Sequence, residues 1–76
     1  MARQNRDAEA LEQLAEAVRL KPGFVEARFN LGVALAKAKR FPEAIEQFRE
    51  TLRLDPANAA AKKFLEQAQA IERRGL

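Results

Sequence analysis

The chain has 76 residues, a length that suffices for one small domain. It contains no cysteine and no histidine, which excludes disulfides, thiolate-bound metals and the commonest general base. Its 14 basic and 11 acidic residues give a net charge of +3, and their interspersed signs indicate a mixed polar surface.

The first predicted helix covers residues 7–20. Apolar residues recur there at helical spacing, and good helix formers fill the positions between them. Pro22 and Gly23 follow, and a proline just past a helix is a common stop signal.

Two further helices are predicted at residues 25–38 and 42–54. The first carries Leu31, Ala34 and Leu35 on one face. Pro42 suits the first turn of the second, because its missing N–H has no partner there anyway. Pro56 comes just after that helix ends.

A fourth helix is predicted at residues 58–73. Asn58 is a suitable N-cap, and Gly75 is a stop signal just past the basic last turn. Because the links between helices are short, consecutive helices must run antiparallel. The fold class is therefore all-α, an antiparallel helix-turn-helix stack of four helices.

Residues 9–36 repeat as residues 43–70. When the sequence is aligned with itself after a shift of 34 residues, twelve of the 28 aligned positions are identical, whereas about two identities would be expected by chance. A fixed period of this length indicates a stacked solenoid, which usually exposes a binding surface. The identical residues in the first copy are Glu9, Ala10, Glu12, Gln13, Glu16, Arg19, Leu20, Pro22, Ala27, Leu31, Ala34 and Ala36.

Residues 25–58 resemble one complete tetratricopeptide repeat, whose pattern is W-x2-L-G-x2-Y, A-x3-F and P. Gly32 and Ala44 are small, which lets the paired helices pack closely. Three residues depart from the family: Arg28 replaces tryptophan, Lys39 replaces a glycine between the helices, and Thr51 replaces alanine. The matching positions are Leu31, Gly32, Leu35, Ala44, Phe48 and Pro56.

The flanking segments resemble half repeats. Residues 7–22 match the second helix of a repeat, and residues 59–74 match the first helix of another. Glu66 and Gln69 replace the family's glycine and aromatic residue in the last helix, which predicts a polar-faced cap over 59–74. The predicted domain is thus half, whole and half a repeat over residues 1–76. We expect Leu11 and the Ala8/Ala15 side of the first helix to be open, which favours self-association.

The resemblance implies a concave groove lined by the first helices of successive repeats. Its apolar middle and charged edges suit a peptide or helix with apolar anchors. The alternative is that Phe29, Val33 and Ile71 cover one another or a second copy. The groove positions are Glu26, Phe29, Val33, Ala36, Lys37, Ala60, Lys63, Gln67, Ala70 and Ile71.

Other functional patterns are weaker. A clamp for a peptide's terminal carboxylate, as in some relatives, would use Asn30 and Lys63, but Val33 and Phe29 stand where it needs polar groups. The basic pairs are dispersed without interleaved aromatic residues, which indicates solvated surface and no nucleic-acid site. Carboxylates one turn apart, such as Glu12 and Glu16, form a solvent-exposed stripe.

Two function hypotheses remain. The first is a non-catalytic protein-interaction module whose groove receives a segment of an unidentified protein. The second is a structural element that homo-oligomerises through its terminal helices, or a piece of a longer scaffold. Thr51 carries the only side-chain hydroxyl, so the usual nucleophile–base pairs cannot be assembled and no enzyme is expected, although a carboxylate pair could act. No cofactor, metal or membrane insertion is expected, and the lack of a signal sequence or apolar span fits a cytoplasmic chain.

Overall fold

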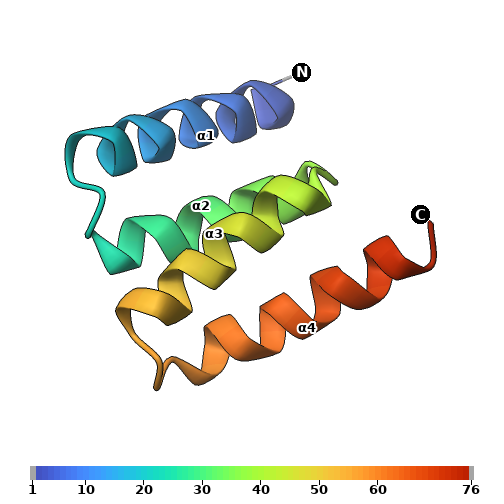
Figure 1. Cartoon of the computed structure of the whole chain (residues 1–76). Helices are drawn as coiled ribbons and strands as arrows, with labels where there is room; N and C mark the ends of the chain where they lie inside the picture. The colour runs from blue at the N-terminus through green and yellow to red at the C-terminus, as the bar shows by residue number, and fades with distance from the viewer. Residues whose placement is uncertain (1, 76) are drawn as a thin grey trace.

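Four α-helices make up the described part of the chain: α1 (Ala2–Leu20), α2 (Val25–Lys37), α3 (Phe41–Leu54) and α4 (Ala59–Arg73). The computed structural model describes the backbone of residues 2–75 and the side chains of residues 8–75. The helices alternate in direction and stack in chain order from α1 to α4 (Figure 1). Each packs against the next, and α2 also contacts α4. The stack measures 35 × 32 × 16 Å. The predicted all-α antiparallel stack is confirmed.

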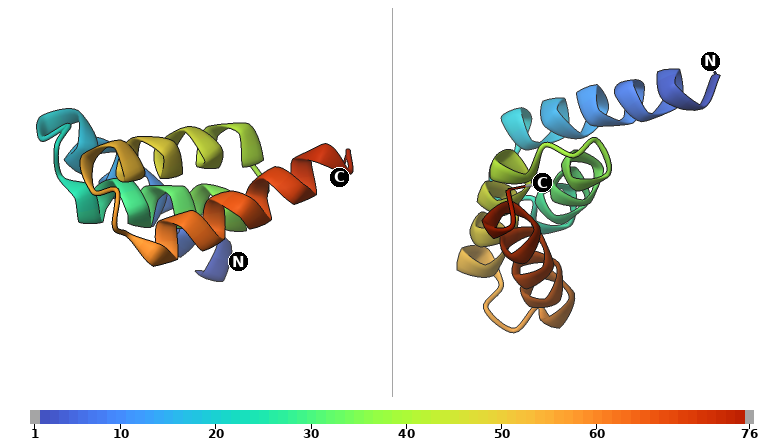
Figure 2. Two further views of the ribbon diagram at one scale, coloured as in Figure 1. Left: turned by 60° about the horizontal axis from the view of Figure 1, so that its bottom comes forward. Right: turned by 90° about the vertical axis from the view of Figure 1, so that its right-hand side faces the viewer.

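The predicted boundaries hold to within one residue, with one exception. α1 begins at Ala2, whereas the apolar pattern predicted a start at residue 7. Residues 2–6 contain neither glycine nor proline, so nothing in the sequence stops the helix from extending through them. The prediction was wrong because these residues carry no apolar periodicity. Toward its N-terminus α1 diverges from the other helices (Figure 2).

The predicted start and stop signals lie where the sequence placed them. Pro42 is in the first turn of α3. The side chain of Asn58 accepts a hydrogen bond of 2.9 Å from the backbone N–H of Ala61, so it caps α4. Gly75 follows α4 with a left-handed φ of 77°, a conformation that glycine adopts freely.

Lys39 adopts a left-handed backbone, with φ of 63°, in the turn between α2 and α3. Its N–H donates to the carbonyl of Ala36 at 2.9 Å, and the next N–H, that of Arg40, donates to Leu35 at 2.9 Å. These bonds close the end of α2. A side chain at this φ is strained by about 1–2 kcal/mol, which explains why the family prefers glycine here.

The core runs between α1, α2 and α3 and reaches α4 through Phe48. An added Cβ on Gly32 would lie 2.7 Å from Cε1 of Phe48. The prediction that a small residue at Gly32 allows close helix packing is therefore confirmed. The buried residues of the core cluster are Val18, Ala27, Leu31, Leu35, Ala44 and Phe48.

The other two departures from the family pattern are accommodated. Thr51 is fully buried, and its hydroxyl donates to the carbonyl of Gln47 at 2.8 Å. Arg28, in place of tryptophan, is half-buried and joins three segments. Its Nε donates to the carbonyl of Pro22 at 3.0 Å, and its Nη1 donates to Oε1 of Gln47 at 3.1 Å. Hydrogen bonds here replace the contacts of an aromatic ring.

Candidate binding groove

A pocket of about 380 Å³ lies between α2 and α4. The 34-residue shift relates these two helices, and Phe41 and Phe48 of α3 also line the pocket. Most of the surface inside the pocket is apolar. The lining residues are Val33, Ala36, Lys37, Phe41, Phe48, Phe64, Gln67, Ala68 and Ile71.

Five of the groove positions taken from the sequence share this pocket: Val33, Ala36, Lys37, Gln67 and Ile71. They come from two helices about thirty residues apart in the chain, so the 34-residue register identified neighbours in space. The other positions do not line it. Glu26, Ala60 and Lys63 are exposed, and Phe29 and Ala70 are half-buried.

Three phenylalanine rings form the groove floor and its support. The Phe29 centroid lies 5.9 Å from that of Phe48 and 5.6 Å from that of Phe64. Phe48 and Phe64 stack with centroids 6.0 Å apart. These separations suit offset and tilted aromatic packing. Phe29 therefore braces the floor from α2, and Phe64, which is 37% exposed, presents its ring to the groove.

Sequence reasoning missed Phe41, Phe48, Phe64 and Ala68 as lining residues. Phe64 occupies the repeat position of Asn30, so the internal repeat contained no signal for an aromatic residue there. Phe41 lies at the start of α3 and reaches the pocket from the turn, a tertiary contact that the pattern of α2 and α4 does not include.

The charges around the groove are sparse. Lys37 lines it and is exposed, and Lys63 is exposed on α4. Each ion pair among the described side chains joins two surface residues three positions apart, either within one helix or between a helix and its N-cap. Neither Lys37 nor Lys63 belongs to such a pair. These pairs are Glu16–Arg19, Arg40–Glu43 and Glu50–Arg53. The groove thus combines an apolar floor with one lysine, Lys37, whose ammonium group belongs to no ion pair among the described residues.

The sequence profile of the tetratricopeptide repeat matches residues 2–59, which is most of the chain. The chain belongs to the tetratricopeptide repeat family. No curated protein sequence matches it significantly. Tetratricopeptide repeats generally mediate protein–protein interactions and are typically non-catalytic scaffolds.

In this tetratricopeptide repeat chain, the 34-residue shift relates α1 to α3 and α2 to α4. None of the helices in residues 2–75 is long and apolar enough to cross a membrane. Among the described residues, no group of acidic side chains gathers closely enough to hold a metal ion.

Proposed function

We propose that this chain is a non-catalytic interaction module whose groove between α2 and α4 binds a segment of a partner protein. The observation that carries the proposal is the apolar pocket of about 380 Å³ built from both first helices. Its volume lies within the range of about 300–1,000 Å³ that is typical of ligand pockets. Membership of a family that generally mediates protein interactions supports it.

The lining defines the chemistry of the segment that fits. Val33 of α2 and Ile71 of α4 line the pocket together with Phe48 and Phe64, so the pocket favours an aliphatic or aromatic anchor side chain. Lys37, which lines the pocket, and Lys63, one helical turn before Gln67 on α4, favour an acidic residue beside that anchor. The proposed ligand is therefore a peptide segment with an apolar anchor flanked by aspartate or glutamate.

The test uses random peptides displayed on phage and selected on the immobilised chain. Selected peptides are synthesised with a fluorophore, and their dissociation constants are measured by anisotropy. We expect acidic residues next to an apolar one to be enriched. Gln67→Arg, which fills the pocket mouth from an exposed position, should weaken binding by about tenfold or more. Lys37→Glu should weaken it similarly and reduce its salt dependence.

Gln13→Arg is the matched control, because Gln13 is exposed on α1 and lies outside the groove. It should leave the dissociation constant unchanged. If the selected peptides bind Gln67→Arg and Lys37→Glu as tightly as the unmodified chain, the groove is not their site and the proposal is wrong. Phe29→Ala is a poor test, because Phe29 supports the floor and its loss destabilises the fold.

Self-association is the second candidate function, because the α1 side of the stack is open. Ala8 and Ala15 are exposed and Leu11 is only half-buried. Light scattering across a concentration series tests this candidate. If the open helix joins copies, Leu11→Glu should lower the average mass at high concentration, and an unchanged mass would exclude α1 from the interface.

A further inference from the structure

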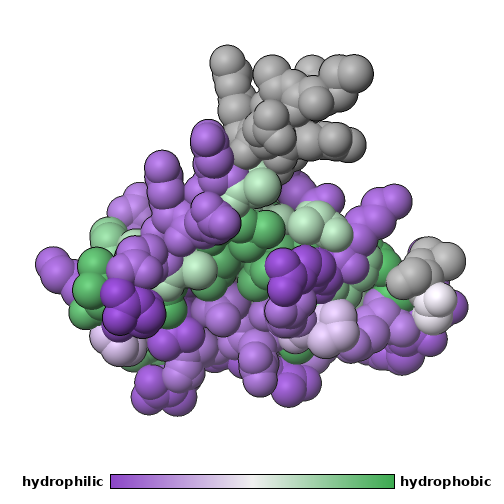
Figure 3. Space-filling view, turned by 90° about the horizontal axis from the view of Figure 1, so that it is seen from above, coloured by the Kyte–Doolittle hydropathy of each residue, from purple (hydrophilic) through white to green (hydrophobic). Residues whose placement is uncertain are grey.

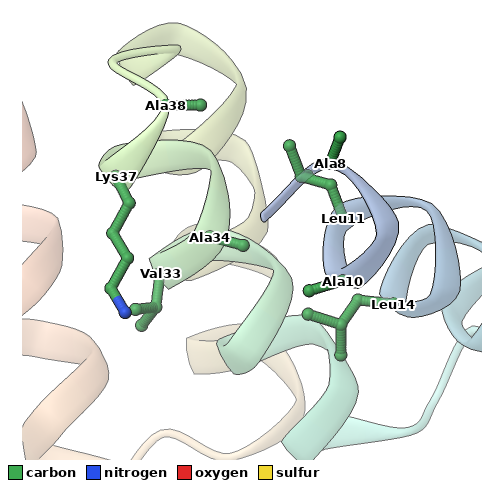
Figure 4. Close-up of a pocket in the computed structure, with 8 residues that line it drawn as sticks. All are labelled: Ala8, Ala10, Leu11, Leu14, Val33, Ala34, Lys37 and Ala38. Atoms are coloured by element: carbon green, nitrogen blue, oxygen red, sulfur yellow. The ribbon is translucent and has the colours of Figure 1, made fainter. Parts of the chain in front are cut away.

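A second apolar pocket, of about 400 Å³, lies between α1 and the C-terminal half of α2. Leu14 points from α1 toward α2, and Ala34 points from α2 toward α1 (Figure 4). Seen from the α1 side, apolar side chains gather in the middle of the molecule with hydrophilic ones around them (Figure 3). We name this surface the open face; its residues are Ala8, Ala10, Leu11, Leu14, Val33, Ala34, Lys37 and Ala38.

The internal repeat shows what kind of element fits the open face. Four of its eight residues have counterparts 34 positions later in the α2–α4 groove: Leu14 with Phe48, Val33 with Gln67, Ala34 with Ala68, and Lys37 with Ile71. The open face is therefore the groove one repeat earlier, without the first helix that α2 supplies there.

The burial of equivalent alanines makes the same point. Ala44 on α3 is 0% exposed, because α2 packs against it. Its counterpart on α1, Ala10, is exposed. Within the described residues no helix covers α1 as α2 covers α3. A helix packed antiparallel to α1, in the manner of α2, would bury Ala10 and form the second wall of the pocket.

This chain contains one further helix of the α2 type. α4 is the counterpart of α2, and its face that corresponds to the α3-facing side of α2 carries the exposed residues Lys62 and Glu66. Leu65, the counterpart of Leu31, lies between them and is half-buried. In the described structure α4 thus lacks a following helix, and α1 lacks a preceding one.

Polar contacts inside the complete repeat have counterparts between α4 and α1. Arg28 donates to Gln47 at 3.1 Å, and the corresponding residues are Lys62 and Gln13. Arg40 pairs with Glu43 at 2.7 Å. The 34-residue shift relates Arg40 to Arg74 and relates Glu43 of α3 to Glu9 of α1. Lys62 matches Arg28, Gln13 matches Gln47, Arg74 matches Arg40, and Glu9 matches Glu43.

The charges of the two surfaces are mostly complementary. Glu9, Glu12 and Glu16 are exposed along α1, and the exposed basic residues at α4 and its C-cap include Lys62, Arg73 and Arg74. Glu66 on α4 and Arg19 on α1 are exposed charges of the opposite sign. Charge complementarity of this kind fixes register and favours the correct pairing over others.

We propose that α4 of one copy docks on the open face of a second copy, head to tail, in the arrangement that α2 has on α3. Each contact then completes a repeat from two halves. Because α4 and α1 are different surfaces, the interface is heterologous and leaves a free α1 and a free α4 at the two ends of any assembly. The inference does not rest on the ligand proposed for the groove, although Val33 and Lys37 line both pockets.

Two substitutions weaken this interface relative to the intramolecular one. Glu66 stands where Gly32 meets Phe48, and Gln69 stands where Leu35 is buried. In the proposed contact Leu14 stands where Phe48 stands in the complete repeat, and because leucine is smaller it leaves part of the space that the Glu66 side chain needs. The Glu66 carboxylate would still lose its hydration on docking. Association is therefore weak in the unmodified chain, and Glu66→Ala should tighten it by about tenfold. The matched control is Glu46→Ala, which removes an exposed carboxylate from α3 instead.

A complementation experiment with sedimentation velocity tests the proposal. Ala10→Arg blocks the open face. Its counterpart Ala44 is 0% exposed, so a helix docked in the same manner leaves no room for a larger side chain at this position. Lys62→Glu blocks α4 by placing a carboxylate against the acidic stripe. Both positions are exposed, so the fold should be unchanged by circular dichroism. Each variant alone should stay at the chain mass of 8.5 kDa at concentrations where the unmodified chain associates.

Mixed together, the two variants should form a species of twice that mass and no larger one. The reason is that the Ala10→Arg variant retains an unmodified α4, which can dock on the unmodified open face of the Lys62→Glu variant. Arg49→Glu is the control on an exposed position of α3 outside this contact, and it should associate normally. The proposal is overturned if the mixture stays monomeric while the unmodified chain associates. It is equally overturned if either blocked variant still associates alone, or if neither the unmodified chain nor Glu66→Ala associates.

Discussion

The contact between Gly32 and the Phe48 ring makes a quantitative prediction for Gly32→Ala. Glycine to alanine inside a helix normally stabilises by about 0.8–1 kcal/mol. Here the new Cβ would lie 2.7 Å from Cε1, 2.9 Å from Cδ1 and 3.0 Å from Cζ of Phe48. Phe48 is 1% exposed, and its ring is held by Phe29 and Phe64 at centroid separations of 5.9 and 6.0 Å. It therefore cannot move aside without disturbing both neighbours.

Overpacking of this kind costs about 1–3 kcal/mol and exceeds the gain in helix propensity. Two of the three contacts are shorter than 3.0 Å, which places the cost in the upper part of this range, so we expect Gly32→Ala to lower the free energy of unfolding by about 1–2 kcal/mol. For a domain of this size, that corresponds to a fall in Tm of about 5–15 °C. Thermal and urea unfolding followed by circular dichroism at 222 nm, the wavelength commonly used for helices, measure both quantities. Gly23→Ala is the matched control, because nothing lies within 4 Å of its new Cβ. It should leave stability unchanged or raise it by a few tenths of a kcal/mol.

A double-mutant cycle isolates the contact itself. Phe48→Leu removes the ring atoms that the Cβ would meet, so adding Gly32→Ala to Phe48→Leu should be neutral or stabilising. The interaction energy between the two positions should then be about 1 kcal/mol or more. If Gly32→Ala is as stable as the unmodified chain, or if the two changes add without coupling, the close approach does not limit this position and the reasoning is wrong.

Three further predictions concern a turn, a helix cap and a surface ion pair. Lys39→Gly should raise the free energy of unfolding by about 0.5–1 kcal/mol in urea unfolding, because φ at this position is 63°; a loss of stability would show that the Lys39 side chain makes a contact that outweighs the strain. Asn58→Ala should cost about 1 kcal/mol, because it removes the cap that accepts from Ala61, and amide exchange should show fraying confined to the start of α4. Arg19 lowers the pKa of the Glu16 carboxylate below its ordinary value of 4.5 by donating a hydrogen bond to it. The stabilisation from this pair is therefore present above the unfolded-state pKa and is lost as the pH falls through the lower folded-state value. In Arg19→Gln an NMR titration should show the pKa of Glu16 raised toward 4.5, and an unchanged pKa would contradict the pairing.

Most of the fold was predictable because the relevant signals are local. Pro22, Pro42 and Pro56 mark helix ends through their fixed φ and missing N–H, and Asn58 caps through its own side chain. The start of α1 was not predictable from the apolar pattern, because residues 2–6 form helix without contributing an apolar face. Helix propensity extends an existing helix but does not mark where it begins.

The groove was predictable where it follows the repeat and not where it depends on tertiary contacts. Val33, Lys37 and Ile71 line the pocket because the 34-residue register places first helices side by side. Phe64 has no aromatic counterpart at Asn30, so its ring cluster with Phe29 and Phe48 depends on three-dimensional packing alone. Likewise Lys39 could be identified as a departure from glycine, but its left-handed φ required the structure.

The groove and the open face can be distinguished by which helix they stabilise. A ligand in the groove contacts Phe64 and Ile71, so it holds α4 against α2; at a ligand concentration of one hundred times Kd it adds about 2.7 kcal/mol to the native state. A second copy on the open face contacts Ala10 and Leu14 and so holds α1. Amide hydrogen exchange separates the two effects, because protection follows the local free energy of opening. A groove peptide should slow exchange mainly in α4, whereas raising the protein concentration should slow it in α1 as well as in the docked α4. If the peptide protected α1 and left α4 unchanged, it would be bound at the open face, and the assignment of the groove as the ligand site would have to be abandoned.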